Sequence, residues 1–375
     1  MDDLEDGAFA QAKNLANLPF TFSHTPLMPD SHPGYGMPLG SILATEGVII
    51  PNAVGVDIGC GMCAQKTNLT ELSQADLIKT LSHARSLIPL GFNWHKKDQD
   101  AALMPKGHQK LNIVSKGYDK ALKQIGSLGG GNHFIEIQKG SDGFIWVMIH
   151  SGSRNLRYSV AKHYNKAAIQ LNEKYHSVVT KNMGLAFIPL EDDLSKDYMV
   201  EMAYCIDFAL ANRKLMMARM MLSIAEIVNT EDVTLETEEL INKSHDFAAW
   251  ENHFGKNVLV HRKGATRAYE DELGMIPDSQ GSSSYIVKDL GNPESFKSCS
   301  YGVGRKLGRK QAQRELNLEA EIKLLNDKGI VRAVRNISDL DEATNAYKDI
   351  DVVMENQKDL AEIVVKLQPL AVLKG

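Results

Sequence analysis

The stretch VGVDIGCG, residues 54–61, places a carboxylate and a thiol among short apolar runs and three glycines. Valine and isoleucine beside glycines predict a short strand and tight turns, because glycine weakens helices and permits backbone conformations that other residues avoid. The preceding residues, 20–53, are equally dense in glycine and proline. We therefore predict that residues 20–61 form turns and short strands around a site.

Regular elements are predicted on both sides of a polar segment. Ser73 precedes Asp76 at the N-cap spacing and opens an apolar period, so a helix is predicted to begin there. Residues 93–116 are polar and are predicted to form a surface loop. Further helices are predicted over residues 158–175, 199–228, 310–326 and 357–370, and strands over residues 144–149, 258–260 and 284–287.

The whole chain is expected to fold as one unit. Helical and strand patterns intermingle without an internal repeat or a linker. This order predicts an α/β protein of mixed α+β character, with one intertwined domain over residues 1–375. Four methionines of the 199–228 helix recur at helical spacing and predict core packing rather than a function: Met216, Met217, Met220 and Met221.

Composition excludes several classes of protein. The 42 Lys plus Arg residues against 47 Asp plus Glu give a net charge of −5, which excludes a uniformly basic nucleic-acid binder. Any RNA contact is therefore expected from a local positive patch. Four cysteines in 375 residues are too few for a disulfide framework, so Cys60 is interpreted as a metal ligand or a nucleophile.

The start of the chain carries no targeting pattern. Asp2, Asp3, Glu5 and Asp6 stand where a secretory leader would have basic residues before an apolar run. No apolar segment approaches the ~20 residues that a membrane helix needs. A cytoplasmic protein without membrane contact is expected.

Three glycine-rich segments carry metal-type ligands: DIGCG at residues 57–61, GGGNH at 129–133 and IHSGSR at 149–154. A thiolate, imidazoles and a carboxylate suit a borderline ion such as Mn²⁺, Co²⁺ or Zn²⁺ better than Mg²⁺. Each segment alone is more simply a structural one, but convergence in space would favour a metal centre. A fourth segment, CSYGVGR at 299–305, has the backbone N–H groups and the arginine of a phosphate-binding loop, a weak signal by itself.

These segments, in this order, resemble the RtcB family of 3'-phosphate/5'-hydroxyl RNA ligases. The resemblance begins at MPDSHPGYG, residues 28–36, and ends at Lys374-Gly375. So many long motifs in one order argue against chance, and they imply an RtcB-like fold around a central metal site, in a monomer. Between these ends lie VGVDIGCG, GGGNHFIE at 129–136, HSGSR at 150–154, HRKGA at 261–265 and AYKDI at 346–350.

The resemblance implies two Mn²⁺ ions with Cys60 as the bridging ligand. His245 lies in SHDF, residues 244–247, where the family usually has a His-Asn pair, so its second residue departs from the pattern. The implied metal ligands are Asp57, Cys60, His133, His150 and His245.

The resemblance also implies that GTP is bound. Glu136 would accept hydrogen bonds from the guanine ring N–H groups, and Lys374 would donate to the guanine carbonyl oxygen. Arg154 resembles a contact to an RNA phosphate, which a guanidinium suits well. The residues implied around the nucleotide are Asn132, Glu136, Ser279, Tyr347 and Lys374.

The implied reaction has three steps, and Tyr301, Cys60 and Arg154 are the implied catalytic residues. A metal-activated histidine attacks the α-phosphate of GTP, the guanylate moves to an RNA 3'-phosphate, and a 5'-hydroxyl displaces GMP. A 2',3'-cyclic phosphate is first opened by hydrolysis. In this chain Tyr301 of YGVGR, residues 301–305, stands where the family has the histidine of HGAGR.

The tyrosine leaves three functions open. A free phenol has a pKa of about 10, so Tyr301 needs a nearby cation to attack, and its phosphodiester would transfer more reluctantly than a phosphoramidate. The chain is either an RNA ligase for RNA repair or tRNA splicing, a metal-dependent phosphoesterase that processes RNA ends, or a non-catalytic protein that binds RNA ends or GTP. The remaining motif residues favour the ligase.

Overall fold

The computed structural model describes residues 4–179, 181–229, 234–331, 334 and 336–375, so Asp2 and Asp3 of the acidic start lie outside the described residues. Its largest sheet has seven strands in the order β12-β13-β15-β5-β6-β4-β8. Every neighbouring pair in this sheet is antiparallel. The strands are β4 (Gly61–Lys66), β5 (Phe134–Gly140), β6 (Ile145–Ser151), β8 (Ile241–Ser244), β12 (Leu273–Ile276), β13 (Ser284–Asp289) and β15 (Ala361–Lys374).

A four-stranded sheet, in the order β1-β2-β10-β9, adjoins the large one. The chain leaves β8 and enters β9 through His245 alone, so the two sheets meet at that residue. Two short pairs, β3 with β7 and β11 with β14, complete the sheets of the described residues. Their bounds are β1 (Leu27–His32), β2 (Leu39–Thr45), β3 (Val48–Ile49), β7 (Ile188–Pro189), β9 (Asp246–His253), β10 (Lys256–Lys263), β11 (Ala265–Arg267) and β14 (Ser298–Ser300).

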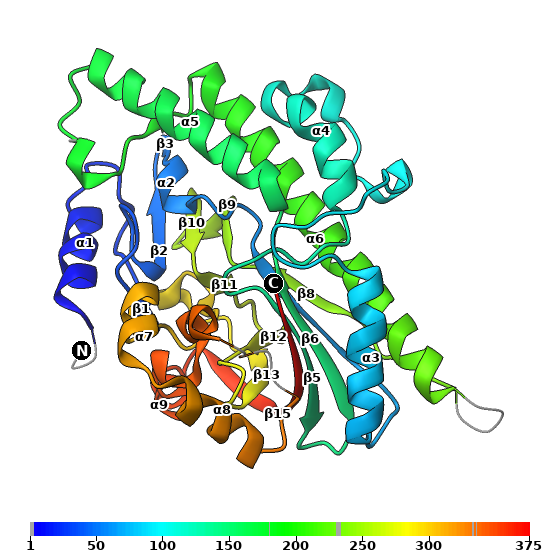
Figure 1. The fold of residues 1–375 in the computed structure, drawn as a ribbon. Helices are drawn as coiled ribbons and strands as arrows, with labels where there is room; N and C mark the ends of the chain where they lie inside the picture. The colour runs from blue at the N-terminus through cyan, green and yellow to red at the C-terminus, as the bar shows by residue number, and fades with distance from the viewer. Residues whose placement is uncertain (1–3, 180, 230–233, 332–333, 335) are drawn as a thin grey trace.

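Helices cover both faces of the large sheet at its centre, where β5 and β6 are buried along almost their whole length. On one face Ile149 packs with Leu81 of α3 and Met216 of α6. On the other face Met148 packs with Leu325 of α8. Figure 1 shows α3, α4, α5 and α6 on one side of the molecule and α7, α8 and α9 on the other. The helices are α1 (Asp6–Ala16), α2 (Pro51–Val54), α3 (Gln74–Leu87), α4 (Asn112–Gln124), α5 (Arg154–Lys174), α6 (Asp193–Val228), α7 (Arg309–Glu315), α8 (Leu318–Asp327) and α9 (Ile350–Glu355).

Most of the element predictions are confirmed, as is the mixed α+β class. The Ser73 hydroxyl accepts from the Asp76 amide at 3.1 Å and caps α3. Helices α5 and α6 and strands β6, β10 and β13 lie where helices and strands were predicted. Met216, Met217 and Met220 of α6 are buried, as the predicted core packing requires.

Three element predictions need correction. The helix predicted over 310–326 is two helices, because the Asn317 side chain accepts from the Ala320 amide at 2.9 Å and starts α8 anew. The loop predicted over 93–116 ends earlier, since α4 begins at Asn112. The helix predicted over 357–370 is wrong: residues 361–374 form β15, which is hydrogen-bonded to β13 on one side and β5 on the other.

Within the described ranges, none of the helices combines the length and the apolar character needed to cross a membrane.

Candidate metal and nucleotide site

Cys60, directly before β4, lies at the centre of a buried group of metal-type side chains. Its Sγ is 3.4 Å from Nε2 of His133 and 3.3 Å from Nε2 of His150. A second group consists of Cys60, His245 and Asp246, and in each group the possible ligand atoms lie within 4.8 Å of one another. The side chains of both groups together are called the metal-type group. The thiol belongs to both groups, so it lies where they meet.

Backbone carbonyls determine which ring nitrogen faces the thiol. Nδ1 of His133 lies 3.0 Å from the Leu128 carbonyl oxygen, and Nδ1 of His150 lies 3.1 Å from that of Asn132. When Nδ1–H donates to a carbonyl, Nε2 keeps its lone pair for a metal ion. Both lone pairs are then directed at the region around Cys60.

Burial sets the charge of these side chains. It lowers the pKa of His150 to about 4, and it lowers the pKa of His133 and of His245 well below the ordinary value. Burial also raises the pKa of the Cys60 thiol and of the Asp246 carboxyl. Neutral imidazoles are ready ligands, and a bound cation would reverse the rise for the thiol and the carboxyl. The donor set therefore fits a borderline divalent ion.

Asp57 belongs to neither of the two groups found among the described residues. Its Oδ1 lies 2.6 Å from Nε of Arg157, and its side chain is 46 % exposed. It is still close enough for its charge to raise the pKa of Cys60, after the larger effect of burial. Its role as a ligand stays a prediction, whereas Asp246 is a carboxylate that sequence reasoning did not select.

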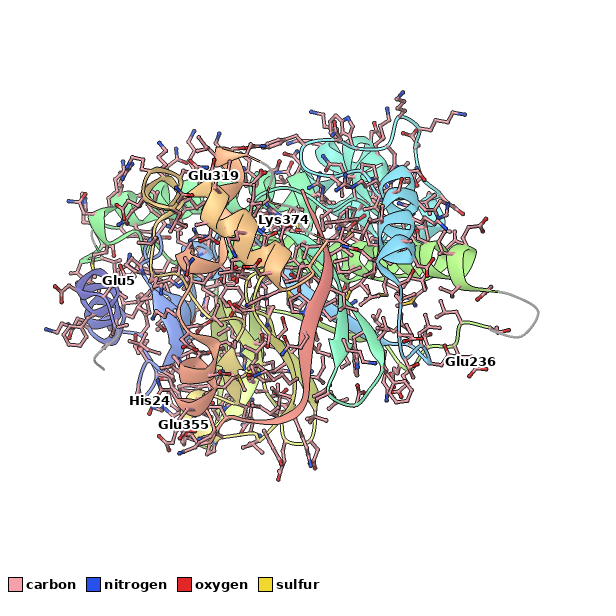
Figure 2. All side chains as sticks on the ribbon, turned by 60° about the horizontal axis from the view of Figure 1, so that its bottom comes forward. Glu5, His24, Glu236, Glu319, Glu355 and Lys374 are labelled. Carbon is pink, nitrogen blue, oxygen red and sulfur yellow. The ribbon has the colours of Figure 1, made fainter. Side chains whose placement is uncertain are left out.

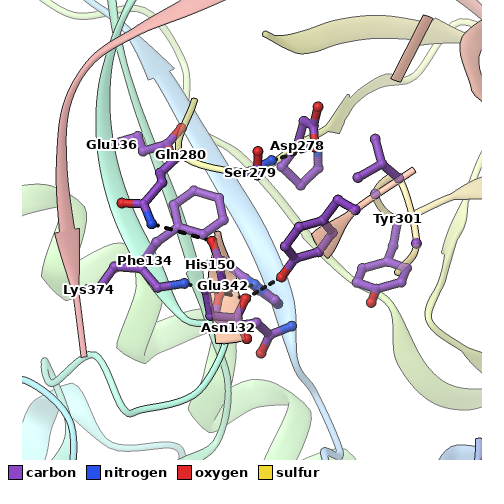
Figure 3. Close-up of a pocket in the computed structure, with 15 residues that line it drawn as sticks. Asn132, Phe134, Glu136, His150, Asp278, Ser279, Gln280, Tyr301, Glu342 and Lys374 are labelled. Atoms are coloured by element: carbon purple, nitrogen blue, oxygen red, sulfur yellow. Dashed lines mark hydrogen bonds and ion pairs between the residues drawn. The ribbon is translucent and has the colours of Figure 1, made fainter. Parts of the chain in front are cut away.

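One pocket gathers the residues predicted to surround a nucleotide (Figure 3). His150 and Tyr301 also line this pocket, so it is continuous with the metal-type group. In Figure 2, Lys374 lies toward the middle of the molecule, whereas Glu5 and Glu355 lie at its periphery. The predicted residues in the pocket lining are Asn132, Glu136, Ser279, Tyr347 and Lys374.

Glu342 is a pocket residue that the sequence interpretation missed. Its carboxylate lies 3.5 Å from Nζ of Lys374 (Figure 3), 3.3 Å from Arg305 and 3.4 Å from Arg309. The Tyr347 hydroxyl donates to it as well. Burial acts to raise the pKa of Glu342, but the three cations outweigh it and hold the pKa below its usual range. The only signal was an acidic pair, residues 341–342, shortly before the AYKDI motif.

Tyr301, directly after β14, lies between the metal-type group and the pocket. Its ring centroid is 4.5 Å from that of His245. Burial, and then the charges of Asp30 and Asp246, raise the pKa of Tyr301. The phenol is therefore a poor nucleophile unless a cation at the metal-type group favours the phenolate.

Arg154 opens α5 beside the metal-type group. One of its NH2 hydrogen bonds goes to the carbonyl oxygen of Gly91, at 2.8 Å, and another to that of Asn93, at 3.3 Å. Its charge is one of those that lower the pKa of His133. The side chain is thus close to the predicted metal site, and its contact with RNA stays a prediction.

Helix α6 holds the loops of the site through Asn212 and Arg213. Arg213 donates to the carbonyl oxygen of Gly59 at 3.0 Å and to that of Ser151 at 2.8 Å. The Asn212 amide donates to the carbonyl oxygen of Gly152 at 3.1 Å. A polar Asn-Arg pair inside a long apolar helix is the sequence signal that would have identified both residues.

Comparison with known proteins assigns the chain to a family. The family model described as tRNA-splicing ligase RtcB matches residues 11–121 and 99–375. The chain is 36 % identical over 399 residues to RNA-splicing ligase RtcB1 of Escherichia coli. It is 35 % identical over 396 residues to RNA-splicing ligase RtcB of Escherichia coli strain K12. Each of these two matches covers 99 % of this chain and 95 % of the relative. It is 30 % identical over 442 residues to tRNA-splicing ligase RtcB of Thermococcus kodakarensis, covering 99 % of this chain and 92 % of that one. The chain therefore belongs to the RtcB family.

Proposed function

We propose that this protein is an RNA ligase that uses GTP and two Mn²⁺ ions to join RNA ends. One end carries a 3'-phosphate or a 2',3'-cyclic phosphate and the other a 5'-hydroxyl, as in RNA repair or tRNA splicing, and the protein acts as a monomer. The names of its relatives support RNA joining. The observation that carries the proposal is that His150 belongs to the metal-type group and also lines the nucleotide pocket.

The metal-type group would hold the ions next to the reacting phosphates. Cys60, His133 and His150 would hold one ion, and Cys60 and His245, with a carboxylate from Asp57 or Asp246, would hold the other. Bound ions would polarise a phosphate and favour the ionised form of a nearby nucleophile. The hydrogen bonds that the imidazoles donate to the Leu128 and Asn132 carbonyl oxygens keep the rings oriented for this task.

The pocket would recognise guanine through complementary hydrogen bonds. Glu136 would accept from the ring N–H groups, and Lys374 would donate to the carbonyl oxygen. Glu342 holds Lys374 in place through the 3.5 Å ion pair. Asn132, Ser279 and Tyr347 complete the wall around the nucleotide.

Tyr301 is the proposed acceptor of the guanylate. Its hydroxyl oxygen would bond to the α-phosphorus of GTP, pyrophosphate would leave, and the phenolic proton would pass to water. Its place beside His245, at 4.5 Å between ring centroids, brings it within the field of an ion held there. The guanylate would then pass to the RNA 3'-phosphate, and displacement of GMP by the 5'-hydroxyl would form the new phosphodiester.

The test is to incubate the protein with Mn²⁺ and α-labelled GTP and to locate bound guanylate by mass spectrometry. We expect a GMP adduct on Tyr301, no adduct in Tyr301→Phe, and an unchanged adduct in the control Tyr285→Phe, whose hydroxyl donates to Asp351 outside this pocket. Labelling that persists in Tyr301→Phe would exclude the covalent role.

A second function is favoured by the raised pKa of Tyr301. A phenol that stays protonated would leave the protein as a metal-dependent phosphoesterase that opens 2',3'-cyclic phosphate ends. That function predicts metal binding and cyclic-phosphate opening without GTP, no guanylate adduct, and no joining. Absence of both reactions, with RNA ends still bound, would indicate a non-catalytic binding protein.

A further inference from the structure

We propose that Arg157 is a second phosphate-binding residue, which acts with Arg154 to hold the terminal 3'-phosphate of an RNA strand beside the metal-type group. This inference rests on the proposed function, because it names residues that select one of the two RNA ends. Neither the motifs nor the relatives' names point to Arg157.

Both arginines reach the metal-type group from the first turn of α5. Their spacing of i and i+3 places them on one face of the helix. A Cβ atom built on Gly152 would lie 3.1 Å from NH1 of Arg157 and 3.3 Å from Cα of Cys60, so this guanidinium lies near Cys60. A Cβ on Gly129 would collide with Arg154 and would lie 2.6 Å from Nδ1 of His133. The two glycines thus leave the space that the guanidinium groups occupy.

The two guanidinium groups have donors to spare. Across the described ranges, Nε of Arg154 and NH1 of Arg157 are buried nitrogens without a hydrogen-bond partner. A buried donor without a partner is costly, and such a group in a native protein calls for an explanation. Planar guanidinium groups match the oxygens of a phosphate, so a phosphate between these residues would satisfy both nitrogens.

The charges favour a terminal phosphate over a bridging one. Arg154 donates to the neutral carbonyl oxygens of Gly91 and Asn93, so those hydrogen bonds do not neutralise it. Arg157 and Arg154 also repel each other, which contributes, after burial, to lowering the pKa of Arg154 to about 10. A phosphate monoester carries up to two negative charges and three free oxygens, whereas a diester carries one charge and two. Once Asp57 no longer pairs with Arg157, the two arginines therefore suit a strand end better than the middle of a strand.

The backbone of Arg154 is consistent with a binding role. Its φ of 54° lies in the left-handed region, which a non-glycine residue adopts at a cost. This residue lies at the junction of β6 and α5, from which Arg154 extends toward Gly129 and His133 and Arg157 extends toward Cys60. Backbone strain of this kind is concentrated at functional sites.

The ion pair between Arg157 and Asp57 couples this site to the metal site. Nε of Arg157 lies 2.6 Å from Oδ1 of Asp57, whose side chain is 46 % exposed. The Arg157 side chain is 23 % exposed, so solvent reaches the pair from the Asp57 side and Asp57 can exchange this contact for another. If Asp57 turns to a metal ion, the guanidinium becomes free for a phosphate. Metal ion and RNA phosphate should then increase each other's affinity by the same factor.

The test compares two RNA oligonucleotides of one sequence, ending in a 3'-phosphate or a 3'-hydroxyl. Their binding to the full chain is measured by fluorescence anisotropy in Mn²⁺ without GTP, so that no joining occurs. We expect the wild type to prefer the 3'-phosphate by tenfold or more, and Arg157→Gln to lower this preference to threefold or less with the 3'-hydroxyl affinity unchanged. Arg157→Lys keeps the charge but loses the planar N–H donors of the guanidinium, so its preference for the 3'-phosphate should lie between those of the wild type and Arg157→Gln.

Lys162→Gln is the matched control, since Lys162 is an exposed cation further along α5, and it should keep the full preference. An equal loss for both oligonucleotides in Arg157→Gln, or no loss, would overturn the inference, as would a wild type without a preference. In a titration of free Mn²⁺, the 3'-phosphate RNA should raise Mn²⁺ affinity in the wild type and not in Arg157→Gln. Because all these readouts omit GTP, they can succeed even where the guanylate adduct fails to form, and the two proposals fail separately.

Discussion

At the scale of single residues, the burial of Glu136 should make nucleotide binding depend on pH. Burial raises the pKa of Glu136 to about 8, although Lys374 and Gln138 act to lower it. A protonated carboxyl cannot accept hydrogen bonds through both oxygens, so guanine should select the ionised form. Below pH 8 the site must release a proton before the proposed contact forms.

GTP affinity should therefore increase with pH up to about 8 and level off above it. One unit of pKa corresponds to about 1.4 kcal/mol, so below that value the Kd should rise by up to about tenfold for each unit by which the pH is lowered. Calorimetric titration with GTP between about pH 6.5 and 8.5, on both sides of the pKa of about 8, measures this change in Kd. Glu136→Gln controls for protonation of the triphosphate: it should bind more weakly at the upper pH and lack the additional slope. Equal slopes in the two proteins would contradict the role of Glu136.

The residues of the candidate site were only partly predictable from the sequence. Cys60 and His150 lie in glycine-rich motifs whose local pattern indicated a ligand, and the structure brings them together. Arg157 and Glu342 gave no such signal, because their importance comes from partners far along the chain. Arg157 meets Asp57, and Glu342 meets Lys374, only in the folded protein.

At the scale of elements, helix α6 links the stability of the fold to the shape of the site. Arg213, which is fully buried, donates to the Asn242 side chain and to the carbonyl oxygens of Gly59 and Ser151. These hydrogen bonds connect α6 to the loop before β4 and to the end of β6. The same helix packs Met216 and Met220 against the sheet, so core and site share one support.

Arg213→Met should destabilise the protein by about 3 kcal/mol or more, because each buried acceptor left without a donor costs about 1–3 kcal/mol. Urea unfolding of the metal-free protein measures the loss. Lys214→Met is the matched control, since Lys214 is exposed on the same helix, and its effect should stay within about 0.5 kcal/mol. Similar losses in the two variants would show that these hydrogen bonds do not support the fold.

Strand β15 shows where local patterns mislead. Residues 357–370 contain three leucines, two lysines and two glutamines, which favour a helix in isolation, beside the β-branched run of residues 363–365, which favours a strand. In the fold, residues 361–367 pair with β13 and residues 367–374 pair with β5, with a register shift near Pro369 that accommodates its missing N–H. Pairing partners from distant parts of the chain override local propensity. Helices α5 and α6 were predictable because their periodicity is long and local.

At the scale of the whole molecule, the candidate site depends on segments from along the entire chain. Strand β4 begins at Gly61 and β15 ends at Lys374, yet both belong to one sheet. Cys60 precedes the first of these strands, and Lys374 ends the last. We therefore propose that residues 1–375 form one domain, in which the metal-type group exists only when the whole chain has folded.

Mn²⁺ should consequently stabilise the entire fold, since a ligand that binds only the folded form adds about 2.7 kcal/mol per site at 100 times its Kd. Thermal unfolding with Mn²⁺ and with a chelator measures this gain. Cys60 belongs to both ligand sets of the metal-type group, so Cys60→Ala should abolish most of the gain in stability. His245 belongs to one set, so His245→Ala should abolish only the gain from that metal site. Cys63→Ala is the matched control: Cys63 is equally buried, but its Sγ faces the Arg213 carbonyl oxygen at 3.9 Å, so the variant should keep the full gain. If Mn²⁺ stabilises Cys60→Ala as much as Cys63→Ala, the thiol is not the shared ligand and the two-ion arrangement is wrong.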